Sequence, residues 1–141
     1  MKKLICIWCF FMVLILSGSS ILQQSGVAEA RIIVENVVNS LTTPLSVDCK
    51  TVNVDYGSQT VAAGEGWGFT VVASEVDPSV ECVFKDGDHA VKTVEIWNYA
   101  RSGYSDVPWY NCDSSCTWEV KEDGFYYLSQ ETGNYKLYSS W

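Results

Sequence analysis

The chain has 141 residues, 48% of them hydrophobic, and its 17 acidic and 9 basic side chains give a net charge of −8 at pH 7. Such an acidic surface repels nucleic acid and anionic membranes, so neither is expected as a main partner. A chain of this length suits one domain rather than several.

The first thirty residues have the features of a secretory signal peptide. Two lysines follow the first methionine, residues 4–16 are apolar, and Ala28-Glu29-Ala30 offers the small residues that signal peptidase accepts. About thirteen apolar residues are fewer than the roughly 20 of a membrane-spanning helix, so a membrane anchor is the weaker alternative. We therefore expect a secreted, extracellular protein with a mature chain of residues 31–141, although an earlier cleavage near Gly18 stays open.

Four cysteines remain after this cleavage, because the other two lie in the signal peptide. They are Cys49, Cys82, Cys112 and Cys116. An even number of cysteines in a small extracellular domain predicts disulfides, each of which stabilises the fold by about 2–4 kcal/mol. Four cysteines allow three pairings, which the sequence leaves open; we favour Cys49–Cys82 with Cys112–Cys116.

Alternating apolar and polar residues indicate half-buried strands through most of the mature chain. The alternation runs through residues 45–49, 67–71, 80–84, 94–97 and 116–120, and residues 32–38 and 135–138 complete the set. From this alternation we expect Trp67 and Trp118 to be buried. Trp97 and Trp109 are expected at the surface, where they are candidates for stacking on a sugar ring.

Turn signals separate the expected strands, at Asp55-Tyr56-Gly57, Asp86-Gly87, Asp123-Gly124 and Gly133-Asn134. Asp-Gly between strands is a strong hairpin signal, because glycine adopts positive φ at little cost. No segment has a sustained helical period, and no internal repeat stands out. The expected fold class is all-β: a small antiparallel, immunoglobulin-like β-sandwich of seven to eight strands, braced by disulfides, with a small barrel as the alternative.

Residues suited to catalysis or metal binding are sparse. His89 is the one histidine, no nucleophile context accompanies it, and we expect it to be an exposed loop residue. Zinc would need several His or Cys ligands, and Asp86 with Asp88 lacks the rest of a calcium loop. Carboxylates suffice for a two-carboxylate glycosidase, but so small a domain offers little room for a substrate cleft. We therefore expect no catalytic residue, no metal and no cofactor.

The longest segment without strand signals, residues 100–115, is the expected partner-binding surface, because loops on a rigid scaffold often carry binding residues. Its candidate residues are Arg101, Tyr104, Asp106, Trp109 and Tyr110. A second candidate loop is residues 85–91. An equally weighted alternative is that Trp109 and Tyr110 fold back and cap one end of the core.

Several motifs together resemble the plant self-incompatibility S1 family. They are Val38-Asn39, Leu45-Ser46-Val47-Asp48-Cys49-Lys50, Trp67-Gly68-Phe69, Val80-Glu81-Cys82-Val83-Phe84, Cys112 to Cys116-Thr117-Trp118, and Asp123-Gly124-Phe125-Tyr126. The set spans nearly the whole mature chain and includes its four cysteines. Two positions depart from the family pattern: Asp48 stands where histidine is usual, and Glu81 where an aromatic residue is common. Both are expected to face outward.

This resemblance implies a secreted plant β-sandwich protein with no known catalytic activity. In the poppy-type system, such a protein is the stigma-side determinant that binds a pollen membrane receptor. The resemblance therefore implies an extracellular signalling or recognition ligand for a cell-surface receptor, without membrane insertion and without a nucleic-acid partner. The alternatives are a carbohydrate-binding module, with a glycan as ligand, and a hydrolase inhibitor.

Overall fold

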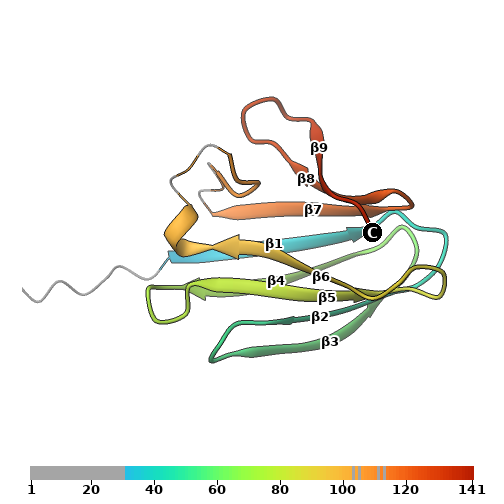
Figure 1. Ribbon diagram of the computed structural model, residues 1–141, viewed down its shortest axis with the longest axis horizontal. Coiled ribbons are helices and arrows are strands. Elements are labelled where there is room, and N and C mark those ends of the chain that lie inside the picture. Colours follow the sequence, from blue (N-terminus) through green and yellow to red (C-terminus); the bar gives the residue numbers. More distant parts are fainter. Residues whose placement is uncertain (1–30, 103, 105, 111, 113) are drawn as a thin grey trace, which may run out of the picture.

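The computed structural model describes residues 31–102, 104, 106–110, 112 and 114–141, and the expected signal peptide lies outside them. The described residues form nine strands and one short 3-10 helix (Figure 1). The elements are β1 (Arg31–Asn39), β2 (Leu45–Lys50), β3 (Asp55–Val61), β4 (Gly66–Ala73), β5 (Ser79–Lys85), β6 (Lys92–Asn98), η1 (Tyr99–Arg101), β7 (Ser115–Lys121), β8 (Gly124–Leu128) and β9 (Tyr135–Ser139).

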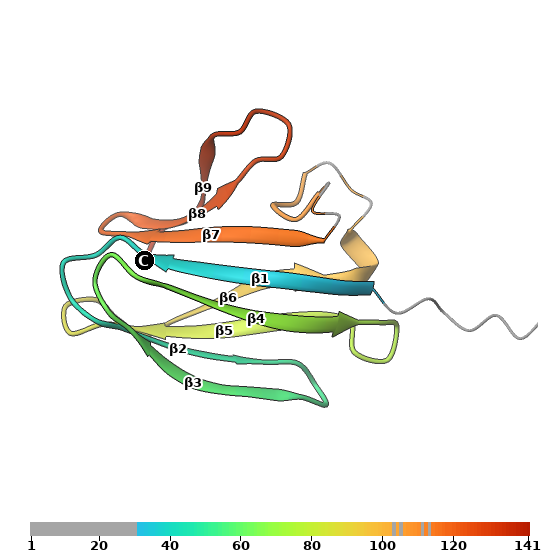
Figure 2. The same cartoon turned by 180° about the vertical axis from the view of Figure 1, so that it is seen from behind.

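Two sheets pack face to face, one in the order β4-β1-β7-β8-β9 and the other in the order β3-β2-β5-β6. The view from behind shows β1, β4 and β7 in one layer and β2, β3 and β5 in the other (Figure 2). All neighbouring strands are antiparallel except β1 and β7, which pair in parallel with Val34 opposite Ser115. The all-β sandwich is confirmed, with nine strands rather than seven or eight and with one parallel pair.

Alternation in the sequence did not reveal β3 or β8. β3 is an edge strand with mostly exposed side chains, so no apolar face marks it. The turn expected at Asp55-Tyr56-Gly57 is instead the start of this strand, where the register with β2 shifts between Asp48 and Lys50 and Gly57 adopts a φ of +82°. In β8, all five residues are buried or half-buried, which also removes the alternation.

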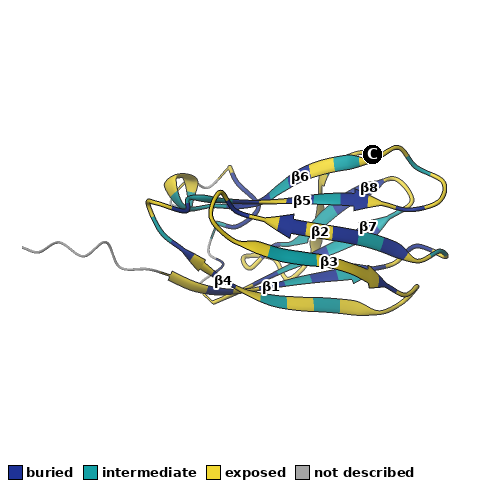
Figure 3. Ribbon diagram, turned by 90° about the horizontal axis from the view of Figure 1, so that it is seen from below, coloured by how far each residue is buried: buried dark blue, intermediate teal, exposed yellow. Residues whose placement is uncertain are grey.

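The core follows the expected alternation in the other strands. Among its members, the side chains of Ile33, Val37, Leu45, Val47, Cys49 and Cys82 are 0% exposed. In Figure 3 buried residues alternate along β2 with half-buried or exposed ones, as its period of two requires. Burying each large aliphatic side chain contributes roughly 1.5–3 kcal/mol.

Trp97 was expected at the surface, and this prediction is wrong because its side chain is 0% exposed. The reason is a β-bulge in β6. Val80 of β5 lies opposite Trp97, whereas the next residue, Glu81, lies opposite Glu95. Ile96 is therefore the extra residue, and the bulge turns Trp97 into the core, where Ile96 is also buried.

The other two strand tryptophans differ in burial. Trp118 lies in a central strand and is 2% exposed, as expected. Trp67 is only half-buried because β4 is an edge strand, which corrects the prediction of a buried residue. It stacks on Phe69 with ring centroids 4.5 Å apart.

Asn39 ties three parts of the fold together at the end of β1. Its side chain is 0% exposed, and its Nδ2 donates to the carbonyls of Thr43 and Val61, both at 2.9 Å. Its Oδ1 accepts the N–H of Leu41, also at 2.9 Å. One amide thus holds the β1–β2 connection against the end of β3.

Candidate functional site

Two disulfides brace the scaffold on which any binding surface rests. Cys49 and Cys82 are bridged across β2 and β5, where they are opposite each other in the register. Cys112 and Cys116 are bridged at the start of β7 with a sequence separation of only 4. This is the pairing that the sequence analysis favoured. The first bridge joins strands of one sheet, and the second fixes the end of the candidate loop.

Three of the five predicted loop residues lie together at the surface. Arg101, at the end of η1, is 48% exposed and its Nη2 lies 3.7 Å from Oδ2 of Asp106, which is 75% exposed. The Tyr104 side chain is 63% exposed, and its N–H donates to the carbonyl of Arg101 at 3.0 Å. We call these three residues the loop face.

The other two predicted residues turn inward. Trp109 is 1% exposed, and its ring centroid lies 6.4 Å from those of Trp97 and Tyr138. Tyr110 is half-buried and packs against the core. The structure therefore favours the alternative in which this part of the loop caps one end of the core. Trp109 is not a surface residue, because its ring packs in the core beside Trp97 and Tyr138.

The two candidate loops lie at opposite ends of the sandwich. Residues 85–91 lead into β6 and the loop face follows it, so the length of β6, roughly 20 Å, separates them (Figure 1). One small contact surface cannot include both loops. The loop face is the better candidate because its side chains are exposed, whereas residues of the other loop bind each other.

His89 belongs to that second loop and is not the exposed residue that we expected. Its side chain is 22% exposed, its Nδ1 lies 2.7 Å from Oδ2 of Asp86, and its Nε2 lies 3.1 Å from the carbonyl of Glu122. The ring stacks on Trp141 with centroids 4.4 Å apart. Both ring nitrogens are thus engaged within the protein, and the ring packs against Trp141.

These contacts also set the charge of the pair. The hydrogen bond to the Asp86 side chain raises the pKa of His89. Burial alone would raise the pKa of Asp86, but the hydrogen bonds that it accepts from the backbone and ring of His89 outweigh burial and lower it. An imidazolium that donates from both nitrogens satisfies the two acceptors at once.

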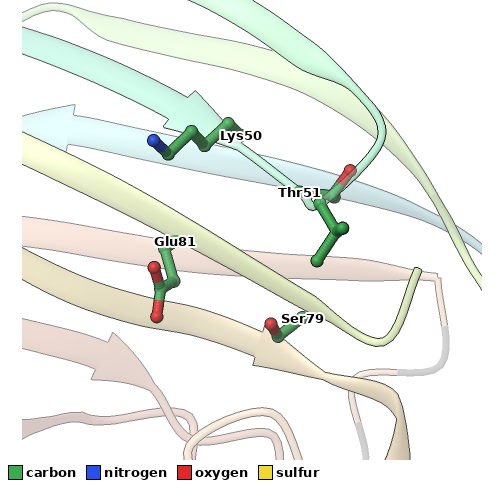
Figure 4. Close-up of a pocket in the computed structure, with 5 residues that line it drawn as sticks. Lys50, Thr51, Ser79 and Glu81 are labelled. Carbon is green, nitrogen blue, oxygen red and sulfur yellow. The ribbon is translucent and has the colours of Figure 1, made fainter.

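An open hollow of about 390 Å³ lies where β2 and β5 meet (Figure 4). It is lined by Lys50, Thr51, Val52, Ser79 and Glu81. Lys50 and Glu81 are opposite each other in the register, so the hollow carries one side chain of each charge. Val52, which is strongly exposed, adds an apolar side chain to this lining. The sequence placed both charged residues outward, but only the register brings them together.

Glu35 is a carboxyl group inside the core. It is 0% exposed and lies between Phe69 of β4 and Cys116 of β7. Neither carboxyl oxygen has a hydrogen-bond partner among the described residues. Burial raises the pKa of Glu35 to about 8, and the nearby Trp118 indole offsets only part of this effect. Glu35 is therefore protonated at neutral pH and has no contact with solvent.

Within the part of the chain that the structure describes, no three His, Cys, Asp or Glu side chains are grouped to hold a metal ion. The Asp86 carboxylate accepts the N–H of Asp88 at 3.0 Å, so this pair closes a turn. No helix among the described residues is long and apolar enough to cross a membrane.

Comparison with known proteins assigns this sandwich to a family. The family described as plant self-incompatibility protein S1 matches residues 31–141. The chain belongs to the plant self-incompatibility S1 family. A solved structure of self-incompatibility protein homologues has a TM-score of 0.50 to this chain at 15% sequence identity, covering 79% of this chain and 91% of that one. Those homologues are described as a widespread family of small, highly stable, secreted proteins from plants. No curated protein sequence matches the chain.

The motifs that carry the S1 resemblance have structural roles here. The asparagine of the first strand, Asn39, makes the three hydrogen bonds described above, and the cysteine motifs form the two bridges. Asp48 and Glu81, which depart from the family pattern, are both exposed as expected. The departures therefore leave the core unchanged and alter the outer surface of one sheet. The extracellular location expected from the sequence agrees with the description of the solved homologues.

Proposed function

We propose that this S1-family protein is a secreted, non-catalytic recognition ligand that binds a receptor protein at the cell surface through its loop face. The observation that carries the proposal is the exposure of Arg101, Tyr104 and Asp106 on a segment held at both ends. η1 continues directly from β6, and the Cys112–Cys116 bridge lies beside the start of β7. A surface preorganised in this way loses little conformational entropy on binding.

The chemistry of the loop face suits protein recognition. Arginine and tyrosine are enriched among the residues that dominate binding energy at protein interfaces. The exposed Arg101–Asp106 pair offers a partner one group of each charge. An exposed ion pair contributes little to stability. The pair can therefore break, and each of its groups can bind a group of the partner instead, at little cost in folding free energy.

The positions of the other chemical groups support a role without catalysis. The ring nitrogens of His89 are both engaged, and Glu35 is sealed in the core. The carbohydrate alternative named Trp97 and Trp109 as stacking residues, and both are buried. A hydrolase inhibitor remains a second candidate, because Ser114 and Ser115 are exposed beside a disulfide. Inhibition of one enzyme in a panel of plant and pathogen hydrolases would support it.

The test compares the protein with a triple variant, Arg101→Ala, Tyr104→Ala and Asp106→Ala, in binding to isolated plant membranes. We expect saturable, protease-sensitive binding that the variant weakens by at least about tenfold while its unfolding curve is unchanged. Trp109 is left intact because its replacement would open a cavity in the core.

A matched control replaces Ser58, Gln59 and Thr60, which are exposed on β3, and is expected to keep full binding. Equal binding by the loop-face variant and the protein would refute the proposal. Binding that survives protease treatment of the membranes, with matching signals on a glycan array, would replace the receptor by a carbohydrate.

A further inference from the structure

β9 is an open edge of the sandwich. It ends the five-stranded sheet, and no described strand pairs with its outer side (Figure 1). At the other end of the layers, β3 and β4 contact each other and close that side. The first four residues of β9, Tyr135–Tyr138, are all exposed, although the Tyr138 ring packs edge-on against Trp118 with ring centroids 5.5 Å apart.

The backbone of β9 is ready to accept another strand. At the end of the hairpin, the N–H of Ser129 donates to the carbonyl of Asn134 at 2.9 Å. Bonded and non-bonded positions alternate along an antiparallel pair, so Lys136 bonds back to β8. Tyr135 and Leu137 therefore direct their N–H and C=O groups away from the sheet.

The side chains of β9 are apolar on both faces of the sheet. Tyr135 is 39% exposed and Leu137 53% exposed on one face, and Tyr138 is 38% exposed on the other. Proteins usually protect such edges with several charges, a proline or a strand that covers them. β9 carries one lysine and no proline, and its one irregularity is a register shift with β8 between Phe125 and Tyr126, beyond the Tyr135–Leu137 segment. Its edge therefore has the exposed apolar surface that strand-addition sites use.

Space for the side chains of an added strand lies between the two open edges. A hollow of about 380 Å³ separates β9 from β6, the edge strand of the other sheet. It is lined by Lys92, Thr93, Val94, Glu95, Tyr138 and Ser139. A strand added to β9 would direct every second side chain into this hollow and the others outward.

Charge indicates which kind of segment fits. Residues 31–141 contain seven basic side chains, and four of them lie near β9: Lys92, Arg101, Lys121 and Lys136. Acidic side chains lie there too, namely Glu95, Glu119 and Glu131. The Lys121 ammonium lies 5.7 Å from the ring centroid of Tyr135. Among the described residues, neither Lys92 nor Lys136 forms an ion pair, whereas Lys121 and Arg101 do.

Lys92 and Lys136, which form no ion pair among the described residues, stand out because the molecule as a whole is acidic. Without residues 1–30, which contain two lysines and one glutamate, seven basic and sixteen acidic side chains give a net charge of about −9. A second copy would place Lys136 near its own counterpart and bring together two strongly acidic molecules. A short acidic segment of another protein carries far less negative charge than a second copy and places it beside Lys92 and Lys136.

We propose that the β9 edge binds an extended, acidic segment of a partner protein, which adds to the five-stranded sheet as an antiparallel strand. The proposal deepens the proposed function and rests on it in assuming a protein partner. Tyr135 and Leu137 would form the main-chain hydrogen bonds with the added strand. The exposed side chains of β9 would make the apolar contacts, and Lys92 and Lys136 would favour an acidic segment.

The test titrates the isotope-labelled, disulfide-bonded protein with a blocked seven-residue peptide of alternating glutamate and valine. We expect saturable NMR shifts of the β9 amides, and hydrogen exchange of the Tyr135 and Leu137 amides slowed by at least about tenfold at saturation. A matched peptide with lysine in place of glutamate should bind at least about tenfold more weakly, and added salt should reduce this difference.

Two variants of Leu137 distinguish the contribution of its backbone N–H to peptide binding from that of its side chain. Leu137→Pro removes an outward N–H, which an edge strand tolerates, and should abolish peptide binding. Leu137→Thr keeps that N–H and should retain binding within a few-fold. If the proline variant does not fold, Lys92→Glu with Lys136→Glu tests the same site, since it should reverse the preference between the two peptides.

Shifts confined to other strands, equal affinity for both peptides, or full binding by Leu137→Pro would each overturn the proposal. The loop-face variant separates this inference from the proposed function. If the peptides fail to bind β9 while the membranes still bind the loop face, only the strand-addition proposal falls. If β9 binds the acidic peptide and no membrane binding is found, the receptor proposal falls instead.

Discussion

Glu35 places a carboxyl group at the centre of the core, between β4 and β7, where the charged form is shielded from solvent and only the Trp118 indole favours it. Burial raises its pKa from a usual value of 4.5 to about 8. The stabilising effect of its protonated form is fully present below about pH 4.5 and is lost as the pH rises through 8. The loss of unfolding free energy over this range is on the order of 5 kcal/mol.

Glu35→Gln should remove this pH dependence, because glutamine has a similar shape and no charge to bury. At pH 8 we expect the variant to be more stable than the parent by several kcal/mol, on the order of the loss above, and at pH 4.5 nearly equal to it. Urea unfolding at both pH values measures this. Glu65→Gln, at an exposed position, is the control and should keep the parent's slope. An unchanged slope in Glu35→Gln would contradict the assignment.

Asn39 is the second residue whose replacement has a defined cost. Asn39→Ala removes three hydrogen bonds and leaves the buried carbonyl of Val61 without its side-chain donor. We expect a loss of about 2–3 kcal/mol in the free energy of unfolding. The control is Asn36→Ala, which removes one exposed bond to Ser115 and should cost within about 0.5 kcal/mol. Equal losses in urea unfolding would show that burial of the amide is not what matters.

Among the elements, the β8–β9 hairpin depends on the glycine at its base. Gly124 has a φ of +150°, and a Cβ there would clash with the carbonyl oxygen of Ser139 and lie 2.9 Å from Cα of Ser140. Since these are backbone atoms, they cannot move aside without separating β9 from β8. Leu137 also lies close, so the clash reaches into β9 itself.

Gly124→Ala should therefore lower the free energy of unfolding by at least about 2 kcal/mol, more than positive φ alone costs. Amide hydrogen exchange should show the loss first in β8 and β9. Gly87→Ala is the matched control, because nothing lies within 4 Å of its added Cβ and its φ is not positive. Protection in β9 equal to that of the parent would be the contrary result.

For the whole molecule, the two disulfides make unequal contributions. Cys49–Cys82 closes a long loop with a sequence separation of 33, whereas Cys112–Cys116 closes one with a separation of 4. The chain-entropy relation gives about 4 kcal/mol for the first and about 2 kcal/mol for the second. The first bridge is also wholly buried, so its loss leaves a gap in the core.

Paired substitutions to alanine test this ranking. Cys49→Ala with Cys82→Ala should lower the unfolding free energy by at least about 4 kcal/mol, and Cys112→Ala with Cys116→Ala by about 2 kcal/mol. The second pair of substitutions should also loosen the loop that follows η1. Its main effect should therefore be a lower affinity for membranes, with only the small loss of unfolding free energy given above. The reverse order of stabilities in urea unfolding would contradict the argument.

The sequence by itself determined the all-β class, the core positions of most strands and the family resemblance. Period-two alternation suffices for these, because it depends only on neighbouring residues along one strand. It predicted Val47 and Cys82 as core residues and Asp48 and Glu81 as outward residues, and the structure agrees. It also placed Arg101 and Asp106 in one exposed loop.

Only the tertiary structure decided the burial of residues that do not follow the alternation and the order of the strands in each sheet. The bulge in β6 exists in the pairing with β5, so no period within β6 could show that Trp97 turns inward. Trp109 is buried because it closes a space between two sheets, and His89 is half-buried because Trp141 returns to stack on it. The free edge of β9 likewise follows from strand order, which depends on contacts between residues far apart in the chain.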